Sequence, residues 1–307
     1  MTPRVVLLFL DGVGIGPADP EVNPFLRSRL PVLRELLDDV PTLDRFELGG
    51  TAARSFPLDA NLGVDSIPQS GTGQTTLLTG VNAAERFGRQ FGPWTPVALR
   101  PLLEKENVLR RGLEAGLKVA FANAYPRGWP GERRRLAAPP LAARAAGLLN
   151  RHAEHLARGQ AVASEIVNSG WRVHLGHEDL REVTALAAGT TLAQIAAGHD
   201  ITFFAHYATD IAGHRGGLEG AIAALERVDS FLGGYLAAAP PDAVLLVVSD
   251  HGNIEDVTVG HTRNPALGLV VGPYAERRAT ELTSILDVAD ALLRWSREDL
   301  PGGRQEA

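Results

Sequence analysis

The sequence predicts an α/β fold in which a mostly parallel sheet is flanked by helices. Four short apolar runs, each bounded by turn residues, lie at residues 5–10, 201–207, 243–248 and 267–271. Their hydrophobicity is continuous rather than alternating, which is typical of strands buried on both faces of a parallel sheet. Helical patterns lie between and around these runs, at 32–39, 218–238 and 282–295. Strands that alternate with helices indicate a layered α/β core.

The middle of the chain has a different composition. Residues 89–197 are rich in Arg, Ala and Leu, with long helical patterns at 97–116 and 141–170 and a single expected strand at 117–124. Prolines at positions 126, 130, 139 and 140 interrupt this segment. We therefore predict a core built from residues 1–88 and 198–307, with residues 89–197 inserted as a small α/β cap domain.

Composition excludes several classes of protein. The chain has 307 residues, of which 45% are hydrophobic and 21% charged, as in an ordinary globular protein. Its net charge of −6 argues against a nucleic-acid binder, and the absence of cysteine excludes disulfides and thiolate metal sites. No run approaches the roughly 20 apolar residues that span a bilayer, and Asp11 interrupts the first apolar run before it could serve as a signal peptide. We expect a cytoplasmic protein without nucleic-acid or membrane partners.

Acidic residues follow three of the four predicted strands. Asp11 ends the first run, Asp210 follows the second with His214 four residues on, and Asp250-His251 follow the third. In open α/β sheets, ligands bind beyond the carboxyl ends of the strands. Carboxylates gathered there repel one another unless a cation neutralises them, so we predict a divalent metal site to which His261 could return. One such Asp by itself would more often be a turn or a helix cap. The six other histidines are interpreted as surface or cap residues: His152, His155, His174, His177, His199 and His206.

A second candidate element is the run of glycines and small hydroxyl residues at 68–80, Pro-Gln-Ser-Gly-Thr-Gly-Gln-Thr-Thr-Leu-Leu-Thr-Gly. Here Ser70 precedes an apolar helical stretch. A serine at a helix N-terminus has its Oγ among free backbone N–H groups, an environment that binds phosphate and favours an alkoxide. Alone, this pattern would more often be a plain cap. Beside a predicted metal site, we favour Ser70 as an activated nucleophile.

Together these motifs resemble the alkaline phosphatase superfamily, and most closely its branch of cofactor-independent phosphoglycerate mutases and phosphopentomutases. The matching elements run in order along the chain: Asp11-Gly12, Gln69-Ser70-Gly71-Thr72-Gly73, Asp210-x-x-Gly-His214, Ser249-Asp250-His251-Gly252-Asn253 and His261-Thr262-x-Asn264-Pro265. The resemblance implies an alkaline-phosphatase-like core. It also implies two metal ions, one held by Asp11, Asp250, His251 and the Ser70 oxygen, and the other by Asp210, His214 and His261. Nitrogen and oxygen donors of these types suit Mn²⁺ or Zn²⁺.

The expected reaction is phosphoryl transfer through a phosphoserine. Ser70 would attack a small anionic phosphate monoester, and the phosphoryl group would then pass to water, as in a phosphatase, or back to the substrate, as in a phosphomutase. We favour the phosphatase because a short cap is less suited to enclosing a product that must reorient. Gln74 also stands where the mutase group has histidine. A phosphodiesterase and a non-catalytic metal-binding pseudoenzyme are alternatives, and a sulfatase is disfavoured because no formylglycine context is present.

Three residues outside the metal motifs are candidates for substrate binding. Arg86 and Arg89 follow the nucleophile helix and could clamp a phosphate or carboxylate. Asn123 ends the strand expected in the cap and could face the cleft. The basic segment 127–135 fits either a lid over an anionic substrate or a solvated loop. A hydrophobic lid face could equally be a dimer interface, so the sequence leaves the oligomeric state open.

Overall fold

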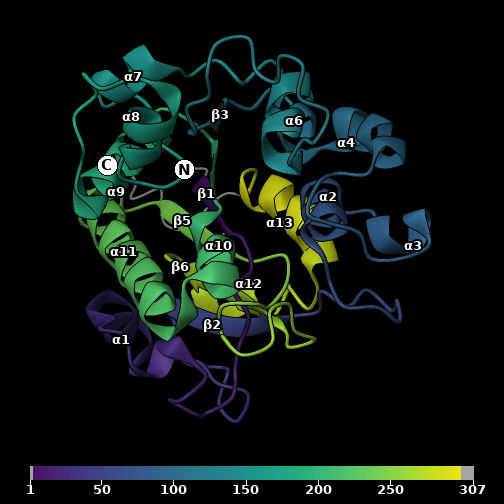
Figure 1. The fold of residues 1–307 in the computed structure, drawn as a ribbon, viewed down its shortest axis with the longest axis vertical. Coiled ribbons are helices and arrows are strands. Elements are labelled where there is room, and N and C mark those ends of the chain that lie inside the picture. The colour runs from purple at the N-terminus through teal and green to yellow at the C-terminus, as the bar shows by residue number, and fades with distance from the viewer. Residues whose placement is uncertain (1–2, 299–307) are drawn as a thin grey trace, which may run out of the picture.

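A computed structural model describes residues 3–298, which fold around one six-stranded sheet (Figure 1). The strands are β1 (Arg4–Leu10), β2 (Ala53–Leu58), β3 (Val119–Phe121), β4 (Ile201–His206), β5 (Ala243–Val248) and β6 (Ala266–Val271). The helices are α1 (Pro31–Leu37), α2 (Ser70–Thr79), α3 (Ala83–Phe87), α4 (Arg100–Glu106), α5 (Val108–Glu114), α6 (Ala138–Ala145), α7 (Ala153–Ala157), α8 (Ser169–Leu175), α9 (Ala185–Ala196), α10 (Ala208–Arg215), α11 (Gly217–Ala238), α12 (Ala275–Ala279) and α13 (Val288–Trp295). Short 3₁₀ helices lie at Pro24–Leu26, Val97–Leu99 and Ile285–Asp287.

The strand order across the sheet is β2-β6-β5-β1-β4-β3. The pairs β5-β1, β1-β4 and β4-β3 are parallel, whereas β6 runs antiparallel to both of its neighbours. The predicted α/β class with a mostly parallel sheet is confirmed. Because β5, β1 and β4 are adjacent and parallel, their carboxyl ends lie at one edge of the sheet, where the predicted acidic residues follow.

Helices cover both faces of the sheet. Side chains alternate along β1, so Val5, Leu7 and Phe9 pack on one face with residues of α2, α5, α6 and α13. The neighbouring residues Val6, Leu8 and Leu10 pack on the other face with α1, α9 and α11. Figure 1 shows the resulting three layers, with α9 and α11 on one side of the strands and α2 and α13 on the other. This double burial explains the continuous apolar runs in the sequence.

Several expected elements are different in the structure. The single helix expected over 141–170 is wrong: α6 ends at Ala145, Gly147 follows with φ of +73°, the five-residue α7 covers Ala153–Ala157, and α8 starts only at Ser169. The helical pattern at 97–116 contains two helices, which Asn107 separates. Strand β2 was not expected, because Arg54 and Pro57 interrupt the apolar pattern of a strand. The strand lies at the sheet edge, where proline is tolerated.

The strand within the predicted insertion pairs with the central sheet. β3 runs parallel to β4, in the register Val119–Ile201, so this part of residues 89–197 completes the core sheet rather than a separate one. Helix α9 likewise packs with α11 in the core. The division of the chain into core and cap stays a prediction, and the segment between α3 and α9 supplies much of the upper part of Figure 1. Within residues 3–298, no helix has the length and apolar character required to cross a membrane.

Candidate metal centre

Polar residues from three adjacent strands meet beyond the carboxyl edge of the sheet. Asp11 follows β1, Asp250 and His251 follow β5, and Asp210 lies in the first turn of α10, just after β4. The segment that follows β5 brings back His261, whose Nε2 lies 3.5 Å from Asp210 Oδ1. We call Asp11, Asp210, His214, Asp250, His251 and His261 the metal cluster, since each has a possible donor atom at this edge.

One group of donors is fully enclosed. His251 Nε2 lies 3.3 Å from Asp11 Oδ1 and 3.7 Å from Asp250 Oδ2, and these three residues offer donor atoms within 4.8 Å of one another. Asp11 Oδ1 and Asp250 Oδ2 are buried and have no hydrogen-bond partner among the described residues. Buried carboxylate oxygens without partners are costly unless a cation binds them, so this group fits a metal ion.

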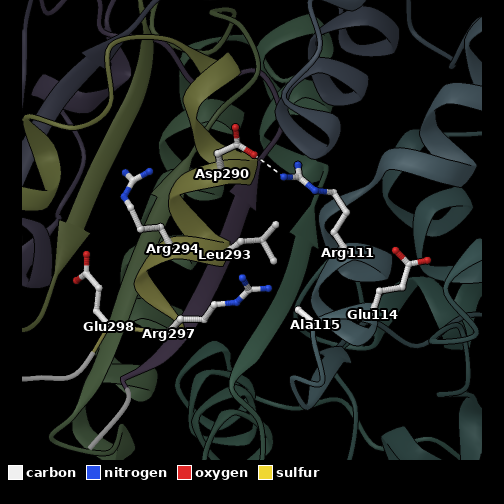
Figure 2. Close-up of a pocket in the computed structure, with 8 residues that line it drawn as sticks. All are labelled: Arg111, Glu114, Ala115, Asp290, Leu293, Arg294, Arg297 and Glu298. Atoms are coloured by element: carbon white, nitrogen blue, oxygen red, sulfur yellow. Dashed lines mark hydrogen bonds and ion pairs between the residues drawn. The ribbon is translucent and has the colours of Figure 1, made fainter.

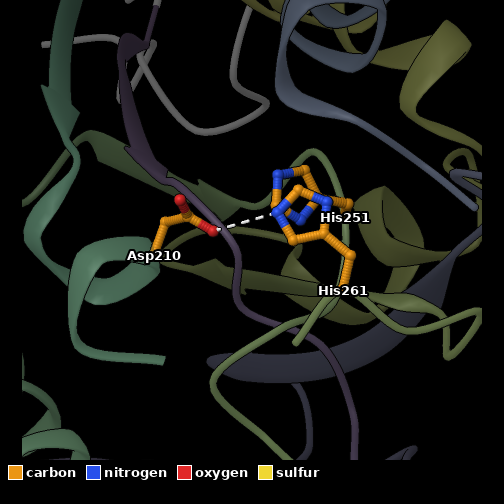
Figure 3. Close-up of side chains that lie close together, drawn as sticks. All are labelled: Asp210, His251 and His261. Carbon is orange, nitrogen blue, oxygen red and sulfur yellow. Dashed lines mark ion pairs between the residues drawn. The ribbon is translucent and has the colours of Figure 1, made fainter. Parts of the chain in front are cut away.

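The second group is more open. Figure 3 shows Asp210, His251 and His261 pointing toward one another, and their donor atoms also lie within 4.8 Å. His214, four residues after Asp210 on α10, places Nε2 3.0 Å from His261 Nε2 and 3.5 Å from Asp210 Oδ1. His261 Nδ1 lies 3.0 Å from the Pro68 carbonyl oxygen; a neutral ring donating there presents the Nε2 lone pair to the cluster.

The two groups share His251. The expected sets were Asp11, Asp250, His251 and Ser70 on one side, and Asp210, His214 and His261 on the other. In the structure, His251 belongs to both groups of donors, and its ring stacks on that of His261 with centroids 4.0 Å apart. The structure thus brings all the expected ligands into one continuous cluster.

The charges in this cluster perturb one another. Burial raises the pKa of Asp11, and burial together with the Asp11 charge raises the pKa of Asp250 to about 8. Burial alone would lower the pKa of His251, but Asp250 and Asp11 raise it to about 10. For Asp210, the hydrogen bond to His261 and the charge of His251 outweigh burial and lower the pKa to about 2. Burial and the neighbouring Asp11 charge thus favour the protonated form of Asp250, and a bound cation would compete with that proton.

Ser70 is the first residue of α2 and lies against the cluster. Its side chain is buried, and Oγ lies 2.9 Å from His251 Nε2. All ten residues of α2 are buried, which its small residues allow, so the helix N-terminus points from the interior toward the cluster. One turn later, Gln74 Nε2 donates to Asp11 Oδ2 at 3.0 Å, while Gln74 Oε1 is buried without a partner among the described residues. Gln74 thus fixes Asp11 through Oδ2 and leaves Asp11 Oδ1 available to a cation.

Two further features of the motifs have structural roles. Gly12 has φ of +67°, and a Cβ there would come within 2.5 Å of Asp210 Oδ1, so glycine allows β1 and α10 to bring their carboxylates together.

Glu255, which the sequence analysis did not identify, is fully buried. It accepts from the N–H groups of Gly14 and Asn253 and from the side chains of Thr262 and Asn264. It therefore ties the segment carrying His261 to the ends of β1 and β5.

A cavity of about 950 Å³ opens directly over Ser70. Its floor includes Asp11, Asp210, His214 and His261 from the metal cluster. Its sides come largely from residues 93–140, together with Tyr207 and the start of α10. A small organic molecule therefore has both room and access to Ser70.

The structure does not bring the three predicted substrate-binding residues to this cavity. Arg86 lines a different cavity, together with Lys105 and Asp290. Arg89 is exposed and lies over the rings of Phe87 and Phe91. Asn123 is fully buried. Its side-chain amide donates to the Ala205 carbonyl oxygen and accepts from the Ala205 N–H, which extends the β3-β4 pairing.

Another cavity, of about 890 Å³, lies between α5 and α13 (Figure 2). None of its lining residues belongs to the metal cluster. Its arginines are largely paired with acids: Arg111 donates to Asp290 at 2.6 Å, and Arg294 donates to Glu281 at 2.7 Å. We therefore assign it no part in the reaction.

His206 differs from the expectation of a surface or cap residue. It ends β4 and is fully buried, and its Nδ1 lies 2.7 Å from the Ser164 carbonyl oxygen. Burial lowers its pKa to about 4, so the ring is neutral at pH 7. The apolar run at 201–207 predicted a buried strand, and that burial was the signal available in the sequence.

Comparison with known proteins agrees with this geometry. The model of a family described as the metalloenzyme superfamily matches residues 3–296. The chain belongs to this superfamily. Among solved structures, the PH0037 protein from Pyrococcus horikoshii aligns over 99% of both chains with a TM-score of 0.58 and 13% identity. The alkaline phosphatase of the Antarctic bacterium TAB5 aligns over 97% of this chain and 99% of its own, with a TM-score of 0.53 and 13% identity. These likenesses confirm the expected alkaline-phosphatase-like fold.

Curated relatives match shorter stretches. A 2,3-bisphosphoglycerate-independent phosphoglycerate mutase from Desulforudis audaxviator is 34% identical over 103 residues, which are 31% of this chain and 20% of the mutase. The corresponding mutase from Rhodopseudomonas palustris is 40% identical over 89 residues, 25% of this chain and 18% of its own. The matched part therefore spans about a fifth of the length of these relatives.

Proposed function

We propose that this protein is a two-metal-dependent phosphatase that acts on a small phosphate monoester through a phosphoserine at Ser70. The observation that carries the proposal is the position of Ser70 Oγ, 2.9 Å from Nε2 of His251, the residue common to both groups of the metal cluster. The nucleophile thus lies at the junction of the two groups, beneath an open cavity. Membership of the metalloenzyme superfamily supports the same chemistry.

The residues suited to holding the metals are those of the cluster. Asp11 and Asp250 would bind one ion with the Ser70 oxygen, Asp210, His214 and His261 would bind the other, and His251 lies between the two sets. Such donors suit Mn²⁺ or Zn²⁺. Bound divalent cations would supply charge neutralisation for the phosphate and a lower pKa for the Ser70 hydroxyl.

The chain's own residues account for the rest of the reaction. The N-terminus of α2 directs backbone N–H groups and the positive end of its dipole toward the phosphate beside Ser70. In the first step, Ser70 Oγ forms a bond to phosphorus as the ester oxygen–phosphorus bond breaks, and the alcohol leaves with a proton. In the second step, water attacks the phosphoserine, which releases inorganic phosphate and restores the hydroxyl.

A phosphomutase is the second candidate. The local identity with phosphoglycerate mutases favours it. Against it, Gln74 stands near the nucleophile and contributes no acid or base, and its amide is engaged with Asp11. A mutase also needs its alcohol product to stay bound while it reorients. Residues 89–197 line only part of the cavity and other segments supply the remainder, so this segment does not enclose a ligand by itself, which suits release of the product to solvent.

The test is phosphate release from a panel of monoesters with Mn²⁺ or Zn²⁺ supplied, comparing wild type with Ser70→Ala. Ser169→Ala is a matched control, because Ser169 is likewise the first residue of a helix, α8, but lies outside the cavity. We expect wild type and Ser169→Ala to release phosphate and Ser70→Ala to fall by at least about a thousandfold. Acid quenching should trap phosphate on Ser70.

Each other outcome has a distinct meaning. Transfer of the phosphate to another hydroxyl of the substrate, without release, would establish the mutase instead. Full activity in Ser70→Ala would eliminate the phosphoserine mechanism. Metal binding without turnover on any ester, in both proteins, would favour a non-catalytic metal-binding role.

A further inference from the structure

The cavity above Ser70 has unusually exposed apolar walls. Four large apolar side chains that line it remain accessible to solvent: Ile67 (46% exposed), Trp94 (39%), Ile211 (58%) and Val259 (64%). They come from four separate segments and surround the polar floor. Apolar side chains gathered at the mouth of a catalytic cavity mark a surface that a ligand covers.

One wall is aromatic, and it is anchored in the core. Trp94, Tyr125 and Trp129 line the cavity, and we call them the aromatic wall. Tyr125 packs edge-on against Trp129 with centroids 5.4 Å apart, and it stacks at 6.1 Å on Phe121 of β3. Phe121 in turn contacts Phe203 of β4 at 5.4 Å. A row of rings thus connects the sheet to the cavity and fixes the wall before any ligand binds.

Trp94 is held close to the nucleophile. A Cβ on Gly71 would come within 2.2 Å of the Trp94 carbonyl oxygen, so the backbone at Trp94 lies directly against the first turn of α2. The next residue, Thr95, donates its N–H to Leu136 at 3.0 Å. The backbone is therefore fixed, while the Trp94 ring pairs with no other aromatic ring of residues 3–298. The Trp94 side chain is 39% exposed and lines the same cavity as Ser70.

The remaining polar lining is basic. Arg133, Arg135 and Arg215 line the cavity, and none of them makes an ion pair or side-chain hydrogen bond within the described part of the chain. The carboxylates that line the cavity, Asp11 and Asp210, both belong to the metal cluster. An anion beyond the aromatic wall would therefore meet guanidinium groups, while the carboxylates that line the cavity are those of the metal cluster.

We propose that the cavity selects phosphate monoesters whose leaving group contains an aromatic ring and, beyond it, a second anionic group. The ring would lie against Trp94 and Trp129, and the anion would contact Arg133, Arg135 or Arg215. This inference rests on the proposed function of the site. Short aliphatic esters, which would leave the aromatic wall uncovered, are poorer ligands.

The test measures binding affinity with phosphonates, so that differences in leaving-group reactivity do not affect the comparison. Methylphosphonate, benzylphosphonate and 4-carboxybenzylphosphonate are titrated by calorimetry into the protein loaded with Mn²⁺ or Zn²⁺. We expect benzylphosphonate to bind roughly tenfold more tightly than methylphosphonate, and the carboxylated compound roughly tenfold more tightly again.

Substitutions then test which residues cause each of the two expected differences in affinity. Trp94→Ala and Trp129→Ala should reduce the benzyl-to-methyl ratio, and Arg133→Gln, Arg135→Gln or Arg215→Gln should reduce the carboxybenzyl-to-benzyl ratio. Arg134→Gln and Tyr274→Ala are matched controls, because both side chains are exposed and neither lines the cavity. The controls should leave both ratios as in wild type.

The outcomes separate this inference from the proposed function. If the three phosphonates bind equally while wild type still hydrolyses monoesters, the specificity inference is wrong and the phosphatase stands. If the Trp and Arg variants keep both ratios, the selectivity arises elsewhere and the inference is equally overturned. If no phosphonate binds and no ester is hydrolysed, the proposed function fails and the inference fails with it.

Discussion

The metal cluster and the aromatic wall face the same cavity but are built differently. Asp250 and His251 are fully buried, and the ends of three adjacent strands position the cluster. The aromatic wall lies in the segment between α3 and α9, and Trp94 at its edge is 39% exposed. In the proposed reaction, the cluster would contact the phosphate that all substrates share, whereas the wall would contact only the part that differs between them.

The contrast assigns different kinetic roles to the two regions. Substitutions in the cluster should lower turnover of every ester by a similar factor, since they act on the common phosphate. Substitutions in the wall should change the ranking of esters. A cluster variant that altered only the ranking, or a wall variant that abolished all turnover, would contradict this division.

The largest effect is expected from Asp250→Asn. This substitution keeps the shape of the side chain but removes its charge, and Asp250 Oδ2 is one of the two partnerless carboxylate oxygens of the cluster. We expect turnover to fall by at least about a thousandfold, roughly 4 kcal/mol, on every ester tested. The rise in Tm that Mn²⁺ or Zn²⁺ gives the wild type should be lost in parallel.

Asp65→Asn is the control, because Asp65 is fully exposed and, among residues 3–298, pairs only with Arg263 on the surface. It should keep both the activity and the metal-dependent rise in Tm. An Asp250→Asn protein that still gains the full wild-type increase would show that this carboxylate is not a metal ligand.

The next largest effect is expected on the pH dependence of stability, at the contact between His206 and Ser164. His206 ends β4 and contacts the carbonyl of Ser164, which lines the cavity from the segment 89–197. Its folded-state pKa of about 4 lies below the unfolded value of 6.5. Between these values the unfolded chain binds the proton and the folded protein does not. The contribution to stability is therefore complete above about pH 6.5 and decreases as pH falls toward 4, by on the order of 3 kcal/mol.

His206→Asn keeps a donor for Ser164 but does not titrate. Urea unfolding of the two proteins between pH 7.5 and 4 should therefore show wild type losing stability relative to the variant as the pH falls. Parallel curves for the two proteins would mean that His206 is not the group responsible.

The same contrast explains what the sequence could predict. Among the candidate ligands, Asp11, Asp210 and Asp250 were identifiable because each follows a continuous apolar run, and parallel strands place their carboxyl ends together. Glu255 was missed because an acid in a loop looks like a solvated charge. Its burial depends on partners from three segments: Gly14, Asn253 and the stretch containing Thr262 and Asn264. Local patterns do not reveal such long-range partners.

The predicted substrate-binding residues show most clearly what could not be predicted from the sequence. Arg86 and Arg89 are candidates in the sequence because they follow the helix that begins at Ser70, but Arg86 on α3 and Arg89 just after it both lie outside the cavity. The side chains that do face it, such as Trp94, Trp129 and Arg135, occur in loops with no periodic pattern. Which loop residues reach a cavity is decided by tertiary packing, which neither spacing nor composition records.

The smallest effect tests whether residues that only orient the cluster behave like the cluster itself. Gln74→Met removes the donor that holds Asp11 Oδ2 at 3.0 Å while keeping a similar volume in a buried position. Because an orienting hydrogen bond affects how well a ligand is placed, we expect metal affinity or kcat to fall by about tenfold on all esters alike. Gln194→Met on α9, which is exposed and outside the cavity, should change neither. A Gln74→Met protein that altered the ranking of esters instead would place Gln74 functionally with the aromatic wall.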